Sequence, residues 1–489
     1  MKLALPSIVD DFEGRRVLVL GDAVLDVYLR GDADRLCREA PVPTVVLRDH
    51  ADAPGAAANA AANLARLGAS VTLLTVVGDD GAAERLAGIL AGHGVDTSAV
   101  VAERGRATVA KHRLLADGQM LARFDEGSLH PPGRATVARL LDHLDAGFER
   151  ADAVLVSDYG LGTLPRPVRR RLGELQRRRP RLVALDAHDL TAWRDLRPTV
   201  VKPNYDELLA LLGLGHLAGP TRAELVEMQG ARVLDATGAQ VAAVTLDGDG
   251  AVILQRGEPP YRTYARAGAR TGVAGAGDTY LAAFTLSLAA GAGAEVAAEV
   301  ASAAAGIVVG KDGTALCSAV ELREALHDDR KEVASLDRLR NCVALHRQRG
   351  HRLVFTNGCF DILHPGHISY LNGAKAQGDV LIVGVNGDRS VARLKGAGRP
   401  INRLEDRVRV LAALSSVDHV VPFDGDTPLD LVDVVRPDVF VKGGDYTVDT
   451  IPEAARVREL GGEVRVLPYV EGRSTTGIIG RAASAAADG

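Results

Sequence analysis

Short apolar runs alternate with alanine-rich segments along almost the whole chain. The runs end in Gly, Asp or Asn, as strands do where they enter a turn, and the alanine-rich segments end in Gly, which is typical of a helix C-terminus. This alternation predicts parallel sheets covered by helices. In the first two thirds of the chain the predicted strands are residues 16–22, 70–79, 153–160, 181–187, 199–204 and 241–250, and helices are expected at residues 56–68 and 82–94.

The pattern is interrupted once, by a charged and helix-prone stretch at residues 322–340. Because a single core rarely grows beyond roughly 250 to 300 residues, a chain of 489 residues is expected to hold more than one domain. We predict domains at residues 1–325 and 341–489, joined by a charged linker at residues 326–340. Predicted strands of the second domain are residues 351–358, 379–388, 419–423, 437–445 and 463–469.

Composition narrows the class of protein. With 47% hydrophobic and 25% charged residues the chain is typical of a globular protein. A formal net charge of -5 gives no sign of a nucleic-acid partner, although it permits local basic pockets for phosphates. No apolar run reaches the roughly 18 to 20 residues needed to span a bilayer, and the first twenty residues lack a signal-peptide pattern. We expect no membrane contact and a cytoplasmic location.

The four cysteines are scattered along the chain without any CxxC spacing. This pattern argues against a disulfide framework and against a zinc site. The cysteines are Cys37, Cys317, Cys342 and Cys359.

Two histidines flank Pro-Gly within residues 357–371, which read NGCFDILHPGHISYL. They could be incidental residues of a turn, or metal ligands that lack a third ligand nearby. We favour a phosphate site, because Pro365 and Gly366 begin a helix whose first amides attract anions. In nucleotidyl transfer, His364 and His367 would donate hydrogen bonds to the charge that develops on the departing pyrophosphate.

The stretch GCFDILHPGH resembles the HxGH signature of the cytidylyltransferase-like nucleotidyltransferases, which have a Rossmann-like parallel sheet. Residues 394–402, the next helix with Arg407, residues 441–446 and residues 472–479 agree in order and spacing. The loop with Gly396 and Gly398 is expected to close over a nucleotide, and the Ser-Thr-Thr stretch could also be an ordinary helix cap. The resemblance implies catalytic roles for His364 and His367 and phosphate or nucleotide contacts from Asn357, Gly358, Cys359, Phe360, Lys395, Arg399, Ser474, Thr475 and Thr476.

A glycine-rich segment, GVAGAGDTYLAAF at residues 272–284, carries the candidate chemistry of the first half. Gly275, Ala276 and Gly277 let the backbone approach a phosphate and present amides at a helix start. Asp278 follows, where a base could take a proton from a sugar hydroxyl that attacks a γ-phosphate. The plainer alternative is that Asp278 only caps the helix.

Residues 21–31, 54–69, 200–207 and 244–250, with this segment, occur in an order that resembles the ribokinase-like carbohydrate kinases over roughly residues 10 to 320. The resemblance implies an α/β domain with a small β lid, and makes Asp278 the catalytic base. It assigns Asp26, Gly55 and Asn59 to the sugar, and Asn204, Tyr205, Asp206, Glu207, Thr245, Gly275, Ala276 and Gly277 to ATP, with Glu207 near Mg²⁺.

Residues 35–46 resemble the lid of one subgroup, and the order of the two halves resembles the bifunctional D-β-D-heptose 7-phosphate kinase/D-β-D-heptose 1-phosphate adenylyltransferases. The resemblance implies ATP-dependent phosphorylation of D-glycero-β-D-manno-heptose 7-phosphate at C1. A separate phosphatase then removes the C7-phosphate, and AMP passes from ATP to the 1-phosphate. It also implies a homodimer through the kinase half.

Five positions of the first half depart from the pattern of that family. Ala56 stands in place of a glycine, Leu161 and His188 in place of lysines, and Gly272 and Ala274 in place of Asp and Thr. Three alternatives stay open: another sugar phosphate, CTP or GTP in the second half, or a weakly active first half that serves as a binding or dimerising scaffold.

Overall fold

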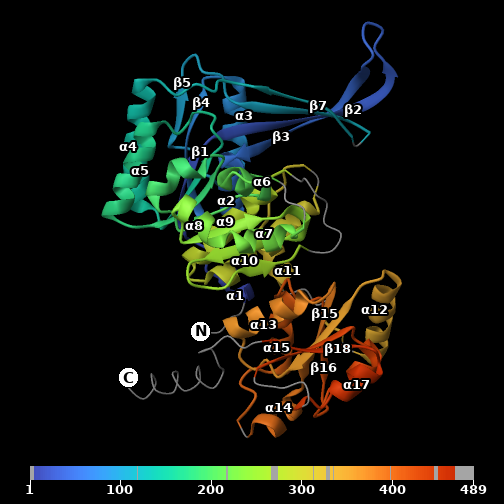
Figure 1. The fold of residues 1–489 in the computed structure, drawn as a ribbon. Coiled ribbons are helices and arrows are strands. Elements are labelled where there is room, and N and C mark those ends of the chain that lie inside the picture. Colours follow the sequence, from blue (N-terminus) through green and yellow to red (C-terminus); the bar gives the residue numbers. More distant parts are fainter. Residues whose placement is uncertain are drawn as a thin grey trace. The chain divides into compact units, whose positions relative to one another are not determined.

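The chain forms two compact units, residues Ser7–Leu322 and residues Arg323–Gly489 together with Met1–Pro6. Each unit has its own sheet in the computed structural model (Figure 1). The structure describes residues 5–117, 119–215, 219–265, 274–311, 313–326, 331–333, 335–396, 398–444 and 450–467.

A nine-stranded sheet of order β13-β12-β11-β10-β9-β8-β1-β4-β5 forms the centre of the larger unit. The strands from β11 to β5 are parallel, whereas β12 and β13 are antiparallel at one edge. The apolar runs are buried on both faces, as expected for parallel strands under helices. The strands are β1 (Arg16–Gly21), β4 (Ser70–Gly78), β5 (Val100–Glu103), β8 (Ala153–Asp158), β9 (Leu182–Ala187), β10 (Val200–Val201), β11 (Val241–Thr245), β12 (Ala251–Gln255) and β13 (Tyr261–Thr263).

Helices cover both faces of this sheet. One face packs on α2 (Ala57–Arg66), α9 (Ala276–Ala289) and α10 (Ala294–Val309). The other face shares a core with α4 (Arg134–Arg150), α5 (Arg166–Arg178), α6 (Tyr205–Leu212), α7 (Arg222–Met228), α8 (Gly230–Thr237) and the 3-10 helix η1 (Leu190–Leu196). Further helices are α1 (Leu5–Asp10), α3 (Gly81–Gly92), η2 (Asp247–Asp249) and α11 (Ala319–Leu326).

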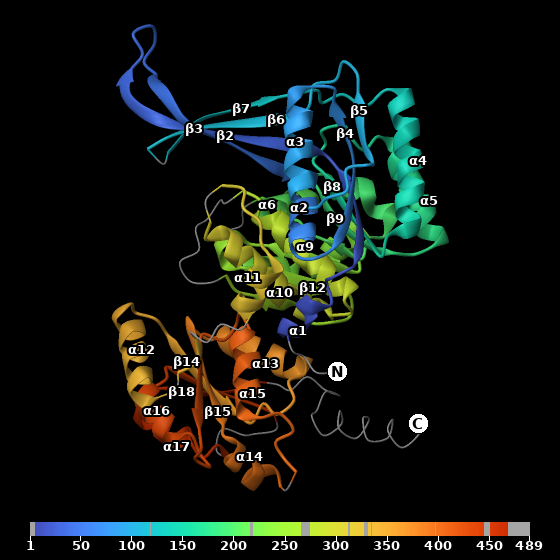
Figure 2. The same ribbon diagram turned by 180° about the vertical axis from the view of Figure 1, so that it is seen from behind.

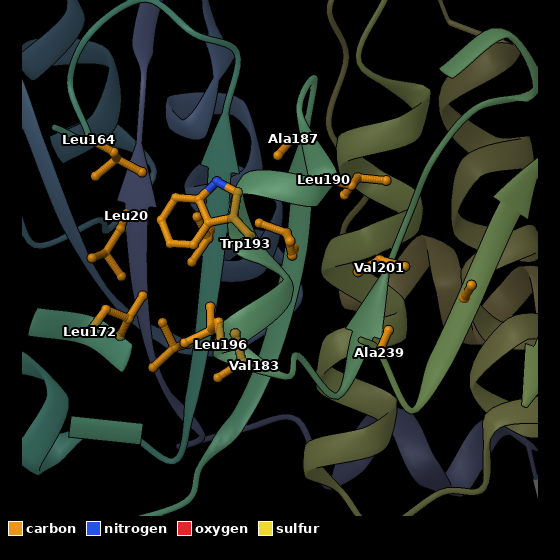
Figure 3. Packing of buried hydrophobic residues seen from close by; sticks show 14 of the residues in the cluster. Leu20, Leu164, Leu172, Val183, Ala187, Leu190, Trp193, Leu196, Val201 and Ala239 are labelled. Carbon is orange, nitrogen blue, oxygen red and sulfur yellow. The ribbon is translucent and has the colours of Figure 1, made fainter. Parts of the chain in front are cut away.

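Trp193 lies in the middle of that core, among Leu20, Leu172 and Val183 (Figure 3). Its indole Nε1 donates a 2.9 Å hydrogen bond to the carboxylate of Asp158, at the end of β8. The hydrogen bond satisfies the polar atom of a buried aromatic side chain.

A second, four-stranded sheet extends away from the large sheet of this unit (Figures 1 and 2). We call it the lid sheet. Its order is β3-β2-β6-β7, and β2 loses burial steadily from its first residue to its last. The strands are β2 (Ala23–Leu36), β3 (Pro43–Ala56), β6 (Ala110–Ala116) and β7 (Gln119–Glu126).

The smaller unit has a fully parallel five-stranded sheet of order β16-β15-β14-β17-β18. Helices α12 (Leu336–Gln348), α16 (Leu429–Val435) and α17 (Ala454–Glu459) share a core with one face, and α13 (Pro365–Lys375) and α15 (Leu404–Ala413) pack on the sheet as well. The remaining elements are β14 (Leu353–Gly358), β15 (Val380–Asn386), β16 (His419–Phe423), β17 (Val439–Gly443), β18 (Glu463–Leu467) and α14 (Asp388–Lys395).

The predicted fold class is confirmed for both halves, including the lid. Helix α12 begins at Leu336, inside the range expected as a linker. Across the described ranges of the chain, no helix combines the length and the apolar character needed to cross a membrane. All four cysteines are free.

Candidate active sites

In each unit the strand order reverses at one point of the sheet, between β1 and β8 in the larger unit and between β14 and β17 in the smaller one. Open α/β sheets bind ligands outside the carboxyl ends of their strands at such a point. Tyr159, which follows β8, contacts Asp278 in the larger unit, and Asn357 of β14 contacts Lys442 of β17 in the smaller one, so part of each predicted site lies at these two places.

Asp278 lies in the first turn of α9 with its carboxylate held from two sides. Asn59 of α2 donates a 2.7 Å hydrogen bond to Oδ2, and the Tyr159 hydroxyl lies 3.3 Å from Oδ1. Burial raises the pKa of Asp278 to about 7 and the nearby Asp186 adds to it, while Asn59 and Lys202 partly offset the rise. A carboxyl with this pKa is suited to act as a general base near neutral pH.

Two buried charged residues beside Asp278 have no role in the sequence analysis. Asp186 is the second-last residue of β9, and Lys202 follows β10 with its Nζ 3.3 Å from the Asp186 carboxylate. Burial would lower the pKa of Lys202, but Asp186, Glu207 and Asp278 hold it above its usual value. The sequence signal for both residues is their position at the carboxyl end of a buried parallel strand.

Two glycines at the start of α9 let the side chains of Lys202 and Asn59 approach the helix backbone closely. A Cβ on Gly277 would lie 3.2 Å from Lys202 Nζ, and a Cβ on Gly275 would lie 2.7 Å from Asn59 Nδ2. Gly275 also has a φ of 88°, which strains any other residue. The first amides of α9, from Ala276 onward, therefore lie beside a buried ammonium group, which favours an anion.

The predicted sugar residues reach the same region from the lid sheet. Asp26 is buried on β2, and its Oδ1 accepts a 2.7 Å hydrogen bond from Arg113 of β6. A Cβ on Gly55 would lie 2.8 Å from Asp26 Oδ2, so a larger residue there would displace the Asp26 carboxylate. Thr314 links Asp26 to the start of α9, because its hydroxyl donates to Asp26 at 3.3 Å and its methyl group faces Gly275.

The predicted ATP residues at α6 are engaged in local structure. Asn204 and Glu207 form a capping box, with hydrogen bonds of 2.8 and 2.9 Å between each side chain and the other's backbone amide. Tyr205 is buried beneath the Arg222 guanidinium, Asp206 is exposed, and Thr245 pairs with Asn204 in an isolated β-bridge.

The structure describes four of the five positions that depart from the family pattern, and it does not explain the substitutions. Ala56 has a φ of 53°, a conformation that favours glycine. Leu161 lies in a loop whose backbone amides donate to the Asp22 carboxylate, and the His188 ring meets Tyr159 edge-on at 5.0 Å. Ala274 comes directly before Gly275, and Gly272 lies outside the described residues.

In the smaller unit, His364 and His367 stand together at the start of α13. Their ring centroids are 4.0 Å apart, and Phe360 lies 5.5 Å from the His367 ring. His364 is only 2% exposed, whereas His367 is partly exposed. Burial, and then the neighbouring His364, lower the pKa of His367 to about 3, so its imidazole is neutral and carries one N–H donor.

Asn357 is the second-last residue of β14 and accepts a 2.7 Å hydrogen bond from Lys442 Nζ near the end of β17. The pair spans the point where the strand order reverses. Burial lowers the pKa of Lys442, and Glu453 opposes this effect. Gly358 is needed beside them, because a Cβ there would lie 3.0 Å from the Phe360 ring.

The structure places the other predicted nucleotide residues less uniformly. Arg399 forms a 2.7 Å ion pair with buried Asp361, whose carboxylate also accepts from the amides of Ile401 and Asn402. Lys395 is exposed at the end of α14, and Cys359 is partly buried. Ser474, Thr475 and Thr476 lie outside the described residues.

Arg407 is a positioning residue for which sequence reasoning proposed no role. Its side chain is 1% exposed, and it donates to the backbone carbonyls of Cys359, Asn386 and Asn402 and to the carboxylate of Asp388. One guanidinium therefore connects the loop after β14, the end of β15 and the start of α14.

Comparisons with known proteins assign the two halves of the chain to two different families. The pfkB family carbohydrate kinase profile matches residues 15–321, and the cytidylyltransferase-like profile matches residues 355–481. Two solved structures share the fold of the larger unit. Arabidopsis thaliana ribokinase complexed with ribose and ATP has a TM-score of 0.52 and 21% identity, and Escherichia coli phosphofructokinase-2 with potassium has 0.53 and 20%. Each comparison covers 64% of this chain and 98% of the other.

Relatives match nearly the whole chain. The bifunctional protein HldE of Pseudomonas paraeruginosa is 42% identical over 482 residues, 98% of both chains. The protein of that name from Mesorhizobium japonicum is 39% identical over 96% of this chain and 95% of its own. The chain thus belongs to the bifunctional HldE family, in which a pfkB carbohydrate kinase domain precedes a cytidylyltransferase-like domain.

Proposed function

We propose that the larger unit transfers the γ-phosphate of ATP to C1 of D-glycero-β-D-manno-heptose 7-phosphate, giving the 1,7-bisphosphate and ADP. The smaller unit transfers AMP from ATP to D-glycero-β-D-manno-heptose 1-phosphate, giving ADP-heptose and pyrophosphate. The observation that carries the proposal is the buried carboxylate of Asp278, which lies between Asn59 toward the sugar and Lys202 beside the first turn of α9.

In the kinase step, Asp278 accepts the proton of the C1 hydroxyl as its oxygen attacks the γ-phosphorus. The bond to the β-phosphate oxygen breaks, and ADP leaves. Lys202 and the first amides of α9 stabilise the negative charge on the transferred group, which is the main task in phosphoryl transfer.

In the transferase step, an oxygen of the sugar 1-phosphate attacks the α-phosphorus of ATP, and the bond to pyrophosphate breaks. No protein nucleophile is needed. His367 donates its single N–H to the phosphates at the start of α13, and Lys442 supplies a positive charge at the end of β17.

The reaction sequence sets further requirements. A separate phosphatase removes the C7-phosphate between the two steps. ATP would bring Mg²⁺ with it, since Mg²⁺ commonly keeps substrate phosphates and waters as ligands, and Glu207 would lie near the metal, with one carboxylate oxygen accepting from the Asn204 amide. We place the protein in the cytoplasm, where ATP is available, and propose that it forms a homodimer through the lid sheet.

The test is ³¹P NMR of the purified protein with heptose 7-phosphate and ATP, followed by the 1-phosphate with ATP, CTP and GTP in turn. We expect a new C1-phosphate signal in the first reaction, and pyrophosphate only with ATP in the second. Asp278→Asn should abolish the first reaction alone, and His367→Ala the second alone. Loss of both activities from either substitution would contradict two separate sites.

A further inference from the structure

The hydroxyl group of Tyr159 lies between two carboxylates. Its oxygen is 3.0 Å from Oδ2 of Asp186 and 3.3 Å from Oδ1 of Asp278. A tyrosine hydroxyl has one hydrogen to donate, although its oxygen can also accept. Asp186 is only 4% exposed, so its hydrogen-bond donors come mainly from the protein. The two carboxylates therefore share one donor.

The loop after β8 fixes Tyr159 in this position. Asp22, which is 1% exposed, accepts from the backbone amides of Tyr159 at 2.8 Å, Leu161 at 3.1 Å and Thr163 at 3.2 Å. The ring of His188 meets the Tyr159 ring edge-on, with the ring centroids 5.0 Å apart. These contacts come from the protein itself, so the hydroxyl is held in place without a substrate.

Asp186 connects Tyr159 to a cation. Its Oδ2, which accepts from Tyr159, is also 3.3 Å from Lys202 Nζ. A Cβ on Gly277, next to Asp278 in α9, would lie 3.2 Å from the same Nζ. These contacts form a path that starts at Asp278 and returns, through Lys202, to the first turn of α9.

The groups around Asp278 act on it in opposite directions. Burial raises the pKa of Asp278 to about 7, and the charge of Asp186 adds to this rise. The hydrogen bond from Asn59, the charge of Lys202 and then the hydrogen bond from Tyr159 lower that pKa. A like charge nearby makes a carboxylate a stronger base, whereas a donor favours its ionised form. Asp186 and Tyr159 therefore have opposite effects on the same base.

Tyr159 keeps its hydrogen while Asp278 titrates. Burial raises the pKa of Tyr159 well above its usual value, and the charges of Asp186, Asp278 and Glu207 add to the rise. The hydroxyl can therefore donate to Asp278 while that carboxylate is ionised. Once Asp278 has taken a proton, the hydroxyl can accept from it and donate to Asp186. One side chain thus contacts the base before and after proton transfer.

We propose that Tyr159 and Asp186 are positioning residues for the kinase base. Tyr159 holds Asp278 in place in both of its protonation states, and Asp186 supplies a second negative charge that makes Asp278 a stronger base. The inference rests on the proposed kinase function and adds two residues to its mechanism. The proton of the C1 hydroxyl passes to Asp278, and the hydrogen of Tyr159 stays on its own oxygen.

The test measures kcat and KM on the full chain across a range of pH, with ATP and heptose 7-phosphate, for wild type, Tyr159→Phe and Asp186→Asn. We expect Tyr159→Phe to lower kcat about 10-fold, the size of one hydrogen bond to a charged group, and to move the midpoint of the pH profile upward. Asp186→Asn should move the midpoint downward by about one pH unit, because a like charge is removed. The KM values of both substrates should change less than about threefold, since only the reacting step is affected.

Two matched variants control for lost packing and lost hydrogen bonds. Tyr261→Phe removes the hydroxyl of a buried tyrosine of β13 that donates to Glu299 of α10. Asp158→Asn removes a carboxylate at the end of β8 that accepts from Trp193, on the other face of the sheet. Both variants should keep the wild-type midpoint, because a loss of stability lowers the rate at every pH without moving the profile.

Midpoints that stay at the wild-type value in both test variants would overturn the proposal, and so would shifts in the same direction. Asp186→Asn leaves the buried Lys202 without its partner and is the variant at risk of not folding. In that case Tyr159→Phe carries the test alone, and a wild-type kcat or an unmoved midpoint in it would overturn the proposal.

Infrared titration separates this inference from the proposed function. The band of the protonated Asp278 carboxyl, identified by its absence in Asp278→Asn, is followed against pH without sugar or ATP. Opposite shifts of its midpoint in the two test variants would support the inference. If such a protein phosphorylated no heptose phosphate, that result would contradict the proposed function alone. A band that titrates at the wild-type pH in both variants would contradict the inference, whichever sugar the kinase uses.

Discussion

In the proposed mechanism, the protonation state of the Asp278 carboxyl group sets the pH range in which the kinase is active. Burial, with Asp186 nearby, raises its pKa to about 7, and only the carboxylate can accept a proton from the sugar. We therefore predict that kcat/KM for phosphoryl transfer falls about tenfold per pH unit below about pH 7 and levels off above it. The measurement is a pH profile of kinase rate with subsaturating sugar.

Asn59 provides the control for that assignment. Its hydrogen bond to Asp278 lowers the pKa of the carboxyl, so Asn59→Ala should move the fall in activity to higher pH, in addition to weakening sugar binding. A profile that stays in place in Asn59→Ala, or that falls only near pH 4 in wild type, would contradict the proposed role of Asp278.

Ala56 has a strained backbone conformation, and it stands where the family pattern has a glycine. Its φ of 53° and ψ of -126° at the start of α2 are sparsely populated by residues with a Cβ. We predict that Ala56→Gly stabilises the larger unit by about 1 kcal/mol, because relief of strain exceeds the entropy cost of glycine. The measurement is denaturant unfolding followed through Trp193, which is buried in that unit.

Ala87 supplies the opposite control. It is exposed in the middle of α3. A glycine there should lower the free energy of unfolding of the larger unit by about 0.5 to 1 kcal/mol. Stabilities that move in the same direction for both substitutions would show that the Ala56 backbone is not strained.

At the level of elements, Arg407 connects segments that approach each other only in the folded unit. Lysine has one ammonium group and cannot reach three carbonyls and a carboxylate at once. We predict that Arg407→Lys destabilises the smaller unit by about 3 kcal/mol through unsatisfied buried acceptors and lowers nucleotidyl transfer, because the loop before His364 loses its support. Thermal unfolding and pyrophosphate release measure the two effects.

The kinase activity of the same preparation is the internal control for Arg407→Lys, and it should remain at the wild-type level. Arg393→Lys offers a matched comparison, since Arg393 pairs with Asp426 at the surface of α14. An equally large loss from Arg393→Lys would indicate that the effect does not come from the buried contacts of Arg407.

Sequence patterns predicted some elements well and others poorly for a physical reason. Strands such as β9 and β15 are buried on both faces, so they appear as uninterrupted apolar runs. The strands β2 and β3 carry charges on an exposed sheet, and only their resemblance to a lid indicated them. The Asp186–Lys202 pair was missed because its members belong to different strands, and only the fold brings them together. Asp278 and the histidine pair could be predicted from the sequence, because each lies within one short motif at a helix start.

At the level of the whole molecule, the two sites belong to separate compact units with separate cores. Each site lies near the point where the strand order of its own sheet reverses. Each also contains a helix start, of α9, which follows β13 in the chain, in the larger unit and of α13, which follows β14, in the smaller one. Under the proposed function, both units would bind phosphate at a helix start, beside the Asp278 carboxylate in one unit and the neutral imidazole of His367 in the other.

The lid sheet exposes large apolar side chains that a soluble monomer seldom leaves uncovered in one region. They are Leu36, Val42, Val46, Leu47, Met120, Leu121 and Phe124. We predict that a second copy of the chain covers them, and that Leu47→Asp or Phe124→Asp raises the dimer dissociation constant at least about 30-fold, the effect of losing one interface hot spot. Light scattering coupled to size exclusion measures the mass across a concentration series.

Met228→Asp is the control, because Met228 is 72% exposed on α7 outside the lid and its substitution should leave the dimer intact. A monomeric wild type, or a dimer that persists in both lid variants, would show that the apolar residues of the lid do not hold two copies together.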